Sequence, residues 1–386
     1  MGKKVTNELV IKKLKGEQGS KVKIGVKRHG FAGILSFEIT RDKIPLYSID
    51  VSYMINENIG YIKISTFART TYDEFKQAVD KLKKQGMTKM VLDLRSNGGG
   101  YLDAAISIAD EFLKENELIV YTKGKSRPRT DYKATSQGVF ENEKLAILID
   151  SWSASASEIV AGAIQDNDRG VIIGRRSYGK GLVQEPTYFR DGSALRLTIA
   201  RYYTPTGRCI QKSYTNGLNE YDHDLIKRFE HGELENADST QFADSLKFVT
   251  KGGKIVYGGG GIMPDVFVPT ETVGLTVFFR QISQKALVYN YAVSYSNQNR
   301  PKLTKFKDYK EIVKYLQAKD VYSDFLVYVR KNGINPTLGD LKESDKLIKT
   351  HLYAYICRNI IDNDGFYPVM MDVDNTLKKA VEVLNK

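Results

Sequence analysis

Four serines lie close together in a turn of small residues. The turn follows the apolar run 145–149 and precedes a helix that we expect to end near Asp166. A hydroxyl at a helix start lies near unpaired backbone N–H groups and the positive end of the helix dipole, both of which favour developing negative charge. A serine at this position can also act only as a helix cap, its usual role. The four are Ser151, Ser153, Ser155 and Ser157.

Lys180 is the candidate base for such a serine. It follows the apolar segment 171–173 and lies between Gly179 and Gly181, which keep bulky side chains away from it. Burial favours the neutral form of a lysine amine, which can then take the proton of a serine hydroxyl near neutral pH. The pair predicts acyl transfer by a serine nucleophile with a lysine base. The residue types alone leave open which serine reacts.

Histidine is the more usual partner of a catalytic serine. None of the four histidines is close in sequence to the serine turn, and two of them lie in the polar stretch 216–244, which we interpret as a surface insertion. A Ser–His triad therefore has no positive support, although sequence distance alone does not exclude it. The histidines are His29, His223, His231 and His351.

A glycine-rich turn has the same design as the serine turn. The apolar segment 89–94 runs into Ser96-Asn97-Gly98-Gly99-Gly100, and a helix is predicted from about 102 to 112. Three glycines allow close approach of the backbone and direct N–H groups at a ligand, which suits an oxyanion hole, although a simple tight turn would also use them. Because both turns follow neighbouring strands of a predicted parallel sheet, we expect them to meet in one crevice.

A phosphate-binding loop is the main rival interpretation of Lys180. Residues 174–180 fit the first seven positions of that motif, but the eighth is Gly181, so the magnesium-binding hydroxyl is absent. The segments 182–184 and 194–200 also predict two strands in place of the required helix. The sequence therefore argues against nucleotide binding.

The composition of the chain excludes several other classes of function. The 386-residue chain has a formal charge of +12, and its dispersed lysines favour a charge-mixed surface over a nucleic-acid site. No apolar run is long enough to span a membrane, and the first residues lack the apolar core of a signal peptide. Cys209 and Cys357 are too few for a disulfide framework or a zinc site, so we expect two unpaired thiols, with one long-range disulfide left open.

The two ends of the chain differ from its centre. Residues 1–45 predict a helix from Thr6 or Asn7 to Lys15 and strands at 21–27 and 33–40, joined by a turn at His29-Gly30. This pattern resembles the second half of a PDZ domain from a processing protease; an ordinary α+β extension is the alternative. Residues 271–386 predict helices, with breaks at Asn335-Pro336 and at 365–368. The helices are expected at 273–285, 308–318, 342–361 and 373–385.

Five motifs between about 55 and 268 together resemble the C-terminal processing peptidases, also called tail-specific proteases. The motifs are 92–100, 153–159, 179–184, 203–208 and 261–265. The resemblance implies an α/β (α+β) fold with a crotonase-like, ClpP-like protease core. The parts are then a partial PDZ module at 1–45, the core at 46–270 with an insertion at about 213–250, and a helical region at 271–386.

The resemblance also assigns the chemistry. By motif position Ser155 is the nucleophile, Lys180 is the general base, and Gln184 orients the lysine amine. No cofactor or metal is implied.

Backbone groups complete the implied site. The oxyanion donors are the N–H of Ala156 and one from Gly99 or Gly100, while Glu158 and Asp166 match acidic positions of the family with supporting roles.

The implied function is that of a serine endopeptidase acting on proteins or peptides near their C-terminal ends. The alternative is a non-catalytic peptide- or ligand-binding module on the same scaffold. Nucleic acid is not an expected partner, a homo-oligomer formed through the helical region is a candidate assembly, and the periplasm or cell envelope is the compartment that the family implies.

Overall fold

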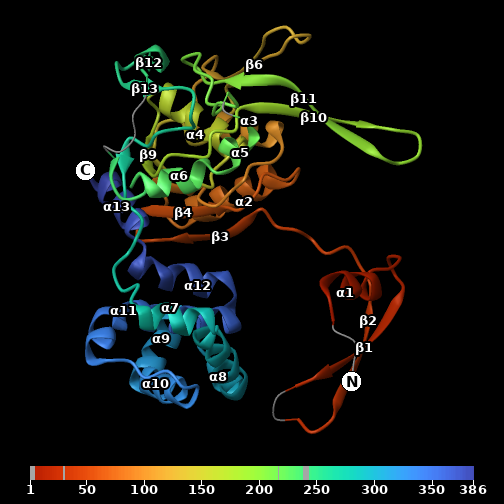
Figure 1. Ribbon diagram of the computed structural model, residues 1–386, viewed down its shortest axis with the longest axis vertical. Coiled ribbons are helices and arrows are strands. Elements are labelled where there is room, and N and C mark those ends of the chain that lie inside the picture. Colours follow the sequence, from red (N-terminus) through yellow and green to blue (C-terminus); the bar gives the residue numbers. More distant parts are fainter. Residues whose placement is uncertain (1–4, 29–30, 216, 238–242) are drawn as a thin grey trace. The chain divides into compact units, whose positions relative to one another are not determined.

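The computed structural model describes residues 5–28, 31–215, 217–237 and 243–386 (Figure 1). The chain divides into two compact units, Met1–Tyr47 and Ser48–Lys386. The candidate site lies entirely in the second unit.

The first unit contains one helix and one antiparallel strand pair. Helix α1 (Asn7–Leu14) is capped by Thr6, whose hydroxyl accepts the N–H of Leu9 at 3.3 Å. Strands β1 (Lys21–Lys27) and β2 (Ile34–Thr40) pair along their whole length. These elements confirm the predicted order, while the expected turn at His29-Gly30 lies outside the described residues. No described residue of α1 is buried, which agrees with there being too few elements to enclose a core.

A six-stranded sheet forms the centre of the second unit. The five strands from β14 to β4 are parallel, and β3 joins the edge antiparallel to β4. Strands β5, β8 and β9 match the apolar segments 89–94, 145–149 and 171–173, whereas β3 and β14 were not predicted. In spatial order the strands are β14 (Val266–Phe267), β9 (Val171–Gly174), β8 (Lys144–Ile149), β5 (Lys89–Asp93), β4 (Ile59–Ile64) and β3 (Ile49–Met54).

Helices cover both faces of this sheet. Side chains alternate along each strand, so Leu92 packs in the cluster beneath three helices, while its neighbour Val91 packs against the C-terminal helix α13 (Asn375–Asn385) on the opposite face. Burial on both faces explains why the central strands are apolar throughout. The three helices on the first face are α2 (Thr71–Lys84), α3 (Leu102–Asp110) and α4 (Ala156–Asp166).

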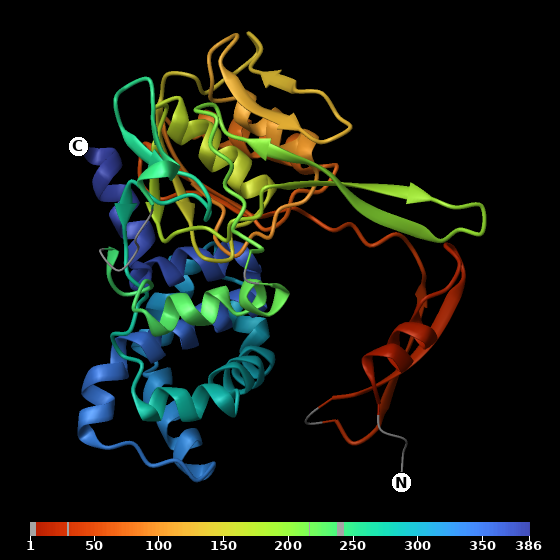
Figure 2. The same ribbon diagram turned by 45° about the horizontal axis from the view of Figure 1, so that its top comes forward.

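A second sheet carries a projecting hairpin. The strands are ordered β10-β11-β6-β7, and β10 and β11 extend beyond the sheet as a two-stranded ribbon (Figure 2). Two strands, not a helix, therefore follow Lys180, as the sequence predicted. The strands are β6 (Leu118–Lys123), β7 (Thr130–Lys133), β10 (Leu182–Tyr188) and β11 (Ala194–Tyr203).

The stretch expected as an insertion contains short elements. Helix α6 (Asp224–Glu230) lies close to the loop 175–181, which carries Lys180. Arg228 Nη1 on this helix donates to the carbonyl of Ser177 at 2.9 Å. The elements are α5 (Leu218–Asp222), α6 (Asp224–Glu230), the 3₁₀ turn η2 (Asp244–Leu246), β12 (Lys247–Val249) and β13 (Ile255–Tyr257).

The C-terminal region is helical, as predicted, and has an apolar cluster of its own. Helix α12 contacts both α11 and β3, and α13 lies on β5, β8 and β9, so this region packs on the core. Its helices are α7 (Val277–Gln284), α8 (Leu287–Leu303), α9 (Tyr309–Ala318), α10 (Val321–Lys331), α11 (Leu338–Ile361), α12 (Asn363–Met370), the 3₁₀ turn η3 (Met371–Val373) and α13.

One predicted break in this region is wrong. Residues 365–368 lie inside α12, and the chain reverses earlier, at Asp362, whose φ is +53°. A side chain at Gly365 would come within 2.9 Å of Cys357 Cβ, so the glycine serves close packing of α11 and α12 and does not end a helix. The break predicted at Asn335-Pro336 is confirmed, since it falls between α10 and α11.

Cys209 and Cys357 are both unpaired, which confirms the expectation of free thiols. Within the described residues, none of the helices has the length and apolar character needed to cross a lipid bilayer.

Candidate active site

The glycine turn and the serine turn are joined directly. They follow β5 and β8, which are parallel neighbours, so both turns leave the same edge of the sheet. The carbonyl of Asn97 accepts the N–H of Ala154 at 3.0 Å and the hydroxyl of Ser157 at 2.9 Å. The carboxylate of Asp150 accepts N–H groups from Ser96 at 3.0 Å in one turn and from Trp152 at 3.0 Å in the other. The predicted meeting of the two turns is therefore confirmed.

Three of the four serines have buried side chains in this arrangement. Ser153 Oγ donates to the carbonyl of Leu94 at 2.8 Å, and Ser157 Oγ donates to that of Asn97. Ser151 Oγ is buried and has no hydrogen-bond partner among the described residues. These three residues are 5% exposed or less, whereas Ser155 is not fully buried.

Ser155 differs from the other three serines. It is half-buried and occupies the cap position before α4 with φ +56° and ψ −113°, a backbone conformation that costs a non-glycine residue free energy. Such strain persists only where neighbouring bonds fix it, and it is concentrated at functional sites. The helix that follows directs its unpaired N–H groups and positive dipole end toward this residue.

One buried carboxylate links Ser155 to Lys180. Glu158 Oε2 accepts the backbone N–H of Ser155 at 2.8 Å and that of Lys180 at 2.9 Å. Its Oε1 accepts the N–H of Gly179 at 2.7 Å and the hydroxyl of Ser177 at 2.5 Å. Burial raises the pKa of the Glu158 carboxyl, and these four donors oppose that shift. The carboxylate fixes the two chain segments that carry the predicted dyad.

Tyr202 on β11 makes a second link between the same residues. Its buried hydroxyl lies 3.1 Å from the carbonyl oxygen of Ser155 and also donates to the carbonyl of Lys180. Lys180 is half-buried. In the part of the chain that the structure describes, no hydrogen bond joins Lys180 Nζ to Ser155 Oγ. Backbone contacts, and not a side-chain contact, therefore bring the predicted pair together.

The glycines of the first turn lie against the serine. A Cβ on Gly99 would come within 2.7 Å of Ser155 Cβ and 2.9 Å of the nitrogen of Ala156. The N–H of Gly99 donates to Asn97 Oδ1 at 2.8 Å, whereas those of Gly100 and Ala156 have no acceptor among the described residues. The arrangement can therefore offer an oxyanion two N–H groups, from Gly100 and Ala156, with Gly99 allowing the close approach.

Two predicted site residues lie elsewhere. Gln184 is exposed on β10, at a bulge, and its amide donates to Thr198 Oγ1 at 3.4 Å. Asp166 lies at the opposite end of α4 from Ser155, about 16 Å away along an 11-residue helix. There it forms a fully buried ion pair with Arg208 at 2.6 Å. The structure does not bring these two residues to the dyad.

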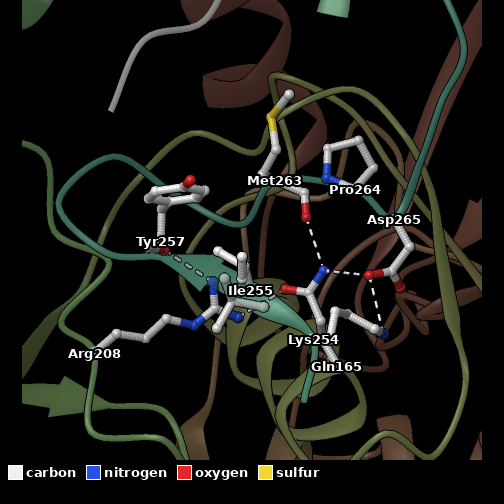
Figure 3. Close-up of a pocket in the computed structure, with 9 residues that line it drawn as sticks. Gln165, Arg208, Lys254, Ile255, Tyr257, Met263, Pro264 and Asp265 are labelled. Atoms are coloured by element: carbon white, nitrogen blue, oxygen red, sulfur yellow. Dashed lines mark hydrogen bonds and ion pairs between the residues drawn. The ribbon is translucent and has the colours of Figure 1, made fainter. Parts of the chain in front are cut away.

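A cavity of about 300 Å³ lies beside Arg208, and Ser155 does not line it (Figure 3). Figure 3 shows the amide of Gln165 donating to the carbonyl of Met263 and to the carboxylate of Asp265, which Lys254 also contacts at 3.1 Å. These polar groups contact one another, so the cavity is part of the scaffold around Arg208.

Sequence reasoning missed Asp150, Asn97, Ser177 and Tyr202. Asp150 stands directly after β8, and Asn97 lies in the turn four residues after β5. Asp and Asn commonly accept backbone N–H groups in turns, and this signal could have identified both. Ser177 and Tyr202 carry no such signal, because their contacts join segments far apart in sequence.

Comparison with known proteins agrees with this geometry. Residues 58–219, which run from β4 to α5 and contain both turns and Lys180, match the model of peptidase family S41. We call this matched stretch the S41 segment. The resemblance to C-terminal processing peptidases is thereby confirmed. A second model, a family of unknown function called DUF8443, matches residues 278–362 of the helical region.

Relatives of the S41 segment carry matching names. A probable CtpA-like serine protease of Staphylococcus saprophyticus is 36% identical over 204 residues, which are 53% of this chain and 41% of that protein. A carboxy-terminal-processing protease of Bartonella bacilliformis is 38% identical over 217 residues, 54% of this chain and 50% of that one. This chain thus spans about half the length of these curated relatives.

A solved structure is also similar. The photosystem II D1 C-terminal processing protease has 26% sequence identity and a TM-score of 0.42, over 67% of this chain and 58% of that one.

Proposed function

We propose that this protein is a serine endopeptidase that cleaves protein or peptide substrates near their C-terminal ends. The observation that carries the proposal is the Glu158 carboxylate, which holds the backbones of Ser155 and Lys180 together inside the S41 segment. The preference for C-terminal ends rests on the names of the relatives, which are carboxyl-terminal processing proteases.

The proposed reaction is acyl transfer. Ser155 Oγ attacks the peptide carbonyl while the neutral amine of Lys180 takes its proton. The N–H groups of Gly100 and Ala156 stabilise the oxyanion, each contributing about 3 kcal/mol. Lys180 then protonates the leaving amine, and water hydrolyses the ester on Ser155. No cofactor takes part in the proposed reaction.

Loss of either dyad side chain tests the proposal. Ser155→Ala and Lys180→Ala are compared with the parent on an unfolded protein substrate, with product ends identified by mass spectrometry. Both variants should lose nearly all turnover and keep the parent's thermal unfolding midpoint. Ser126→Ala and Lys125→Ala, at exposed positions, are the matched controls and should stay fully active. Full activity in either dyad variant overturns the assignment, and substrate binding without turnover in the parent indicates the non-catalytic alternative.

Gln184 has a separate proposed role as a residue that orients Lys180. The support is its family motif position, four residues after the lysine. Gln184→Ala should then lower kcat and leave KM unchanged, and an unchanged kcat excludes the role. Asp166 is proposed to support the site only indirectly, by holding Arg208 at the far end of α4.

The proposed partners and compartment follow the family resemblance. Self-association would use the helical region 271–386, and light scattering across a concentration series tests it. Location in the periplasm or cell envelope is tested by cell fractionation. The division into 1–45, 46–270 and 271–386, with the first part a partial PDZ module, is tested by limited proteolysis and by peptide binding to the first part.

A further inference from the structure

Arg95 connects the glycine turn to the last helix of the structure. Its guanidinium makes a two-pronged contact with the carboxylate of Asp374, Nη1 to Oδ1 at 2.9 Å and Nη2 to Oδ2 at 2.7 Å. Paired contacts of this kind fix the orientation of both groups. The Arg95 side chain is 17% exposed and that of Asp374 is 23% exposed, so water screens the pair only weakly.

Arg95 immediately precedes the turn that holds the proposed oxyanion donor. Its carbonyl accepts Lys63 Nζ at 3.0 Å, and the next residue, Ser96, has φ +60°. The guanidinium also contacts the fully buried Asp93, at 2.6 Å for the shortest pair. The main chain that enters the turn is therefore set by the position of Arg95.

Asp374 provides Arg95 with a second negative charge, in addition to that of Asp93. Asp93 already lies 3.6 Å from the ammonium of Lys63 and accepts the hydroxyl of Tyr61 at 2.6 Å. Lys63 and Arg95 thus share the Asp93 carboxylate, and Asp374 is a second carboxylate in contact with Arg95. Without it, a poorly solvated positive charge would remain next to the turn.

The carboxylate of Asp374 is held by the fold. It caps α13, with Oδ1 accepting the N–H of Leu377 at 2.9 Å. Helix α13 is anchored on the sheet by Leu377, Ala380 and Leu384, which are nearly or fully buried. The position of α13 on the sheet therefore determines where the partner of Arg95 lies.

We propose that Asp374 is a positioning residue for the oxyanion turn: through Arg95 it holds the backbone that leads to the Gly100 donor, so that the helix α13 is part of the catalytic apparatus. The inference rests on the proposed function. It assigns to the C-terminal region a role that neither the S41 segment nor the DUF8443 match covers, because Asp374 lies outside both.

The variant Asp374→Asn isolates the charge, because asparagine caps helices as well as aspartate does. Its kcat should fall about tenfold or more while KM stays within about twofold, since the turn acts on the transition state and not on substrate binding. Asp308→Asn is the matched control: Asp308 caps α9 through the N–H of Glu311 at 3.0 Å. This control should keep kcat within about twofold of the parent. Asp374→Glu restores the carboxylate and should recover activity above the asparagine variant.

Hydrogen exchange provides a readout that does not need turnover. Amides of residues 94–101 should exchange faster in Asp374→Asn than in the parent, and those of the same segment in Asp308→Asn should not. Unchanged exchange and unchanged kcat in Asp374→Asn overturn the inference, as does an equal effect of the two asparagine variants. If the parent itself lacks turnover, the proposed function fails while the exchange comparison still decides the role of Asp374. Should Asp374→Asn fail to fold, Asp374→Ser, which also removes the carboxylate and keeps a helix-capping side chain, carries the same comparison.

Discussion

Glu158 Oε2 lies 2.8 Å from the backbone nitrogen of Ser155. The same oxygen lies 2.9 Å from the nitrogen of Lys180, although the two residues are 25 positions apart in the chain. A single atom therefore contacts both the segment that carries the proposed nucleophile and the one that carries the proposed base, and the Tyr202 hydroxyl provides a second link between them. Four predictions follow from this site and its surroundings.

Replacing the Glu158 carboxylate should damage both stability and activity. In Glu158→Gln one acceptor oxygen becomes an NH₂ group that faces backbone donors, so buried N–H groups lose their partners. We expect the free energy of unfolding to fall by about 1–3 kcal/mol and kcat to fall about tenfold or more. Urea unfolding and steady-state kinetics measure the two effects. Glu115→Gln, at an exposed position, should match the parent; a Glu158→Gln variant that also matches it contradicts the proposed role.

A methyl group on Gly99 should separate the two turns. The added Cβ would lie 2.7 Å from both Ala154 O and Ser155 Cβ, and the φ of +95° is strained for alanine. Gly99→Ala should therefore lower kcat by about 100-fold, because a displacement of about 1 Å at the site is enough for such a loss. Gly192→Ala is the control for backbone strain without a steric clash, since Gly192 has φ +84° and an added Cβ would meet no atom within 4 Å. That control should keep full kcat, and equal kcat in the two variants would show that contact between the turns is unimportant.

The Tyr202 hydroxyl should contribute to holding the dyad backbones. Tyr202→Phe removes the bonds to the carbonyls of Ser155 and Lys180 and leaves the ring in the core. We expect a loss of about 1 kcal/mol in unfolding free energy and a lower kcat at unchanged KM. Tyr203→Phe, whose ring stacks on Tyr121 at 4.8 Å, is the neighbouring control. A larger kcat loss in the control than in Tyr202→Phe contradicts the prediction.

Asp93 should make stability depend on acid pH. Burial raises the pKa of its carboxyl, but Arg95 and Lys63 outweigh that effect and hold the pKa below its ordinary value of 3.8. The folded protein therefore takes up the proton less readily than the unfolded chain. The stabilisation is complete above 3.8 and is lost as the pH falls below that value toward the folded-state pKa.

Urea unfolding at about pH 6 and about pH 3 measures this loss. Asp93→Asn should reduce the difference in unfolding free energy between the two conditions, whereas Asp80→Asn, at an exposed position on α2, should leave it unchanged. An undiminished difference in Asp93→Asn shows that other carboxylates cause the acid sensitivity.

Local sequence patterns predict most of the fold. The apolar segment 89–94 was predicted as a strand because burial on both faces makes such a segment apolar throughout, and it forms β5. Strand β3 was not predicted from the sequence because it is a half-buried edge strand with the polar residues Asp50 and Ser52. The Gly365–Pro368 error has a tertiary cause, since only the contact of Gly365 with α11 explains a glycine inside that helix.

The site was less completely predictable. The family resemblance assigns the roles to Ser155 and Lys180, and the structure adds that Ser153 and Ser157 donate to carbonyls inside the turns. The sequence left Gly99 and Gly100 as alternative donors; the proposal of Gly100 rests on the bond from the Gly99 N–H to Asn97, which no sequence pattern shows. Contacts between distant segments, such as Tyr202 with Ser155, are likewise set by tertiary structure alone.

The contact between Arg95 and Asp374 has a consequence for synthesis of the protein, because the two residues are 279 positions apart. A nascent chain that the ribosome has extended only to residue 360 already contains Ser155, Lys180 and both turns, yet it lacks the carboxylate that balances Arg95 and the helix that covers the second face of the sheet. Contacts between such distant residues form late, because the intervening loop must close first. In the proposed protease, the turn that stabilises the oxyanion would then reach its final position only after Asp374 has been synthesised and has left the ribosome.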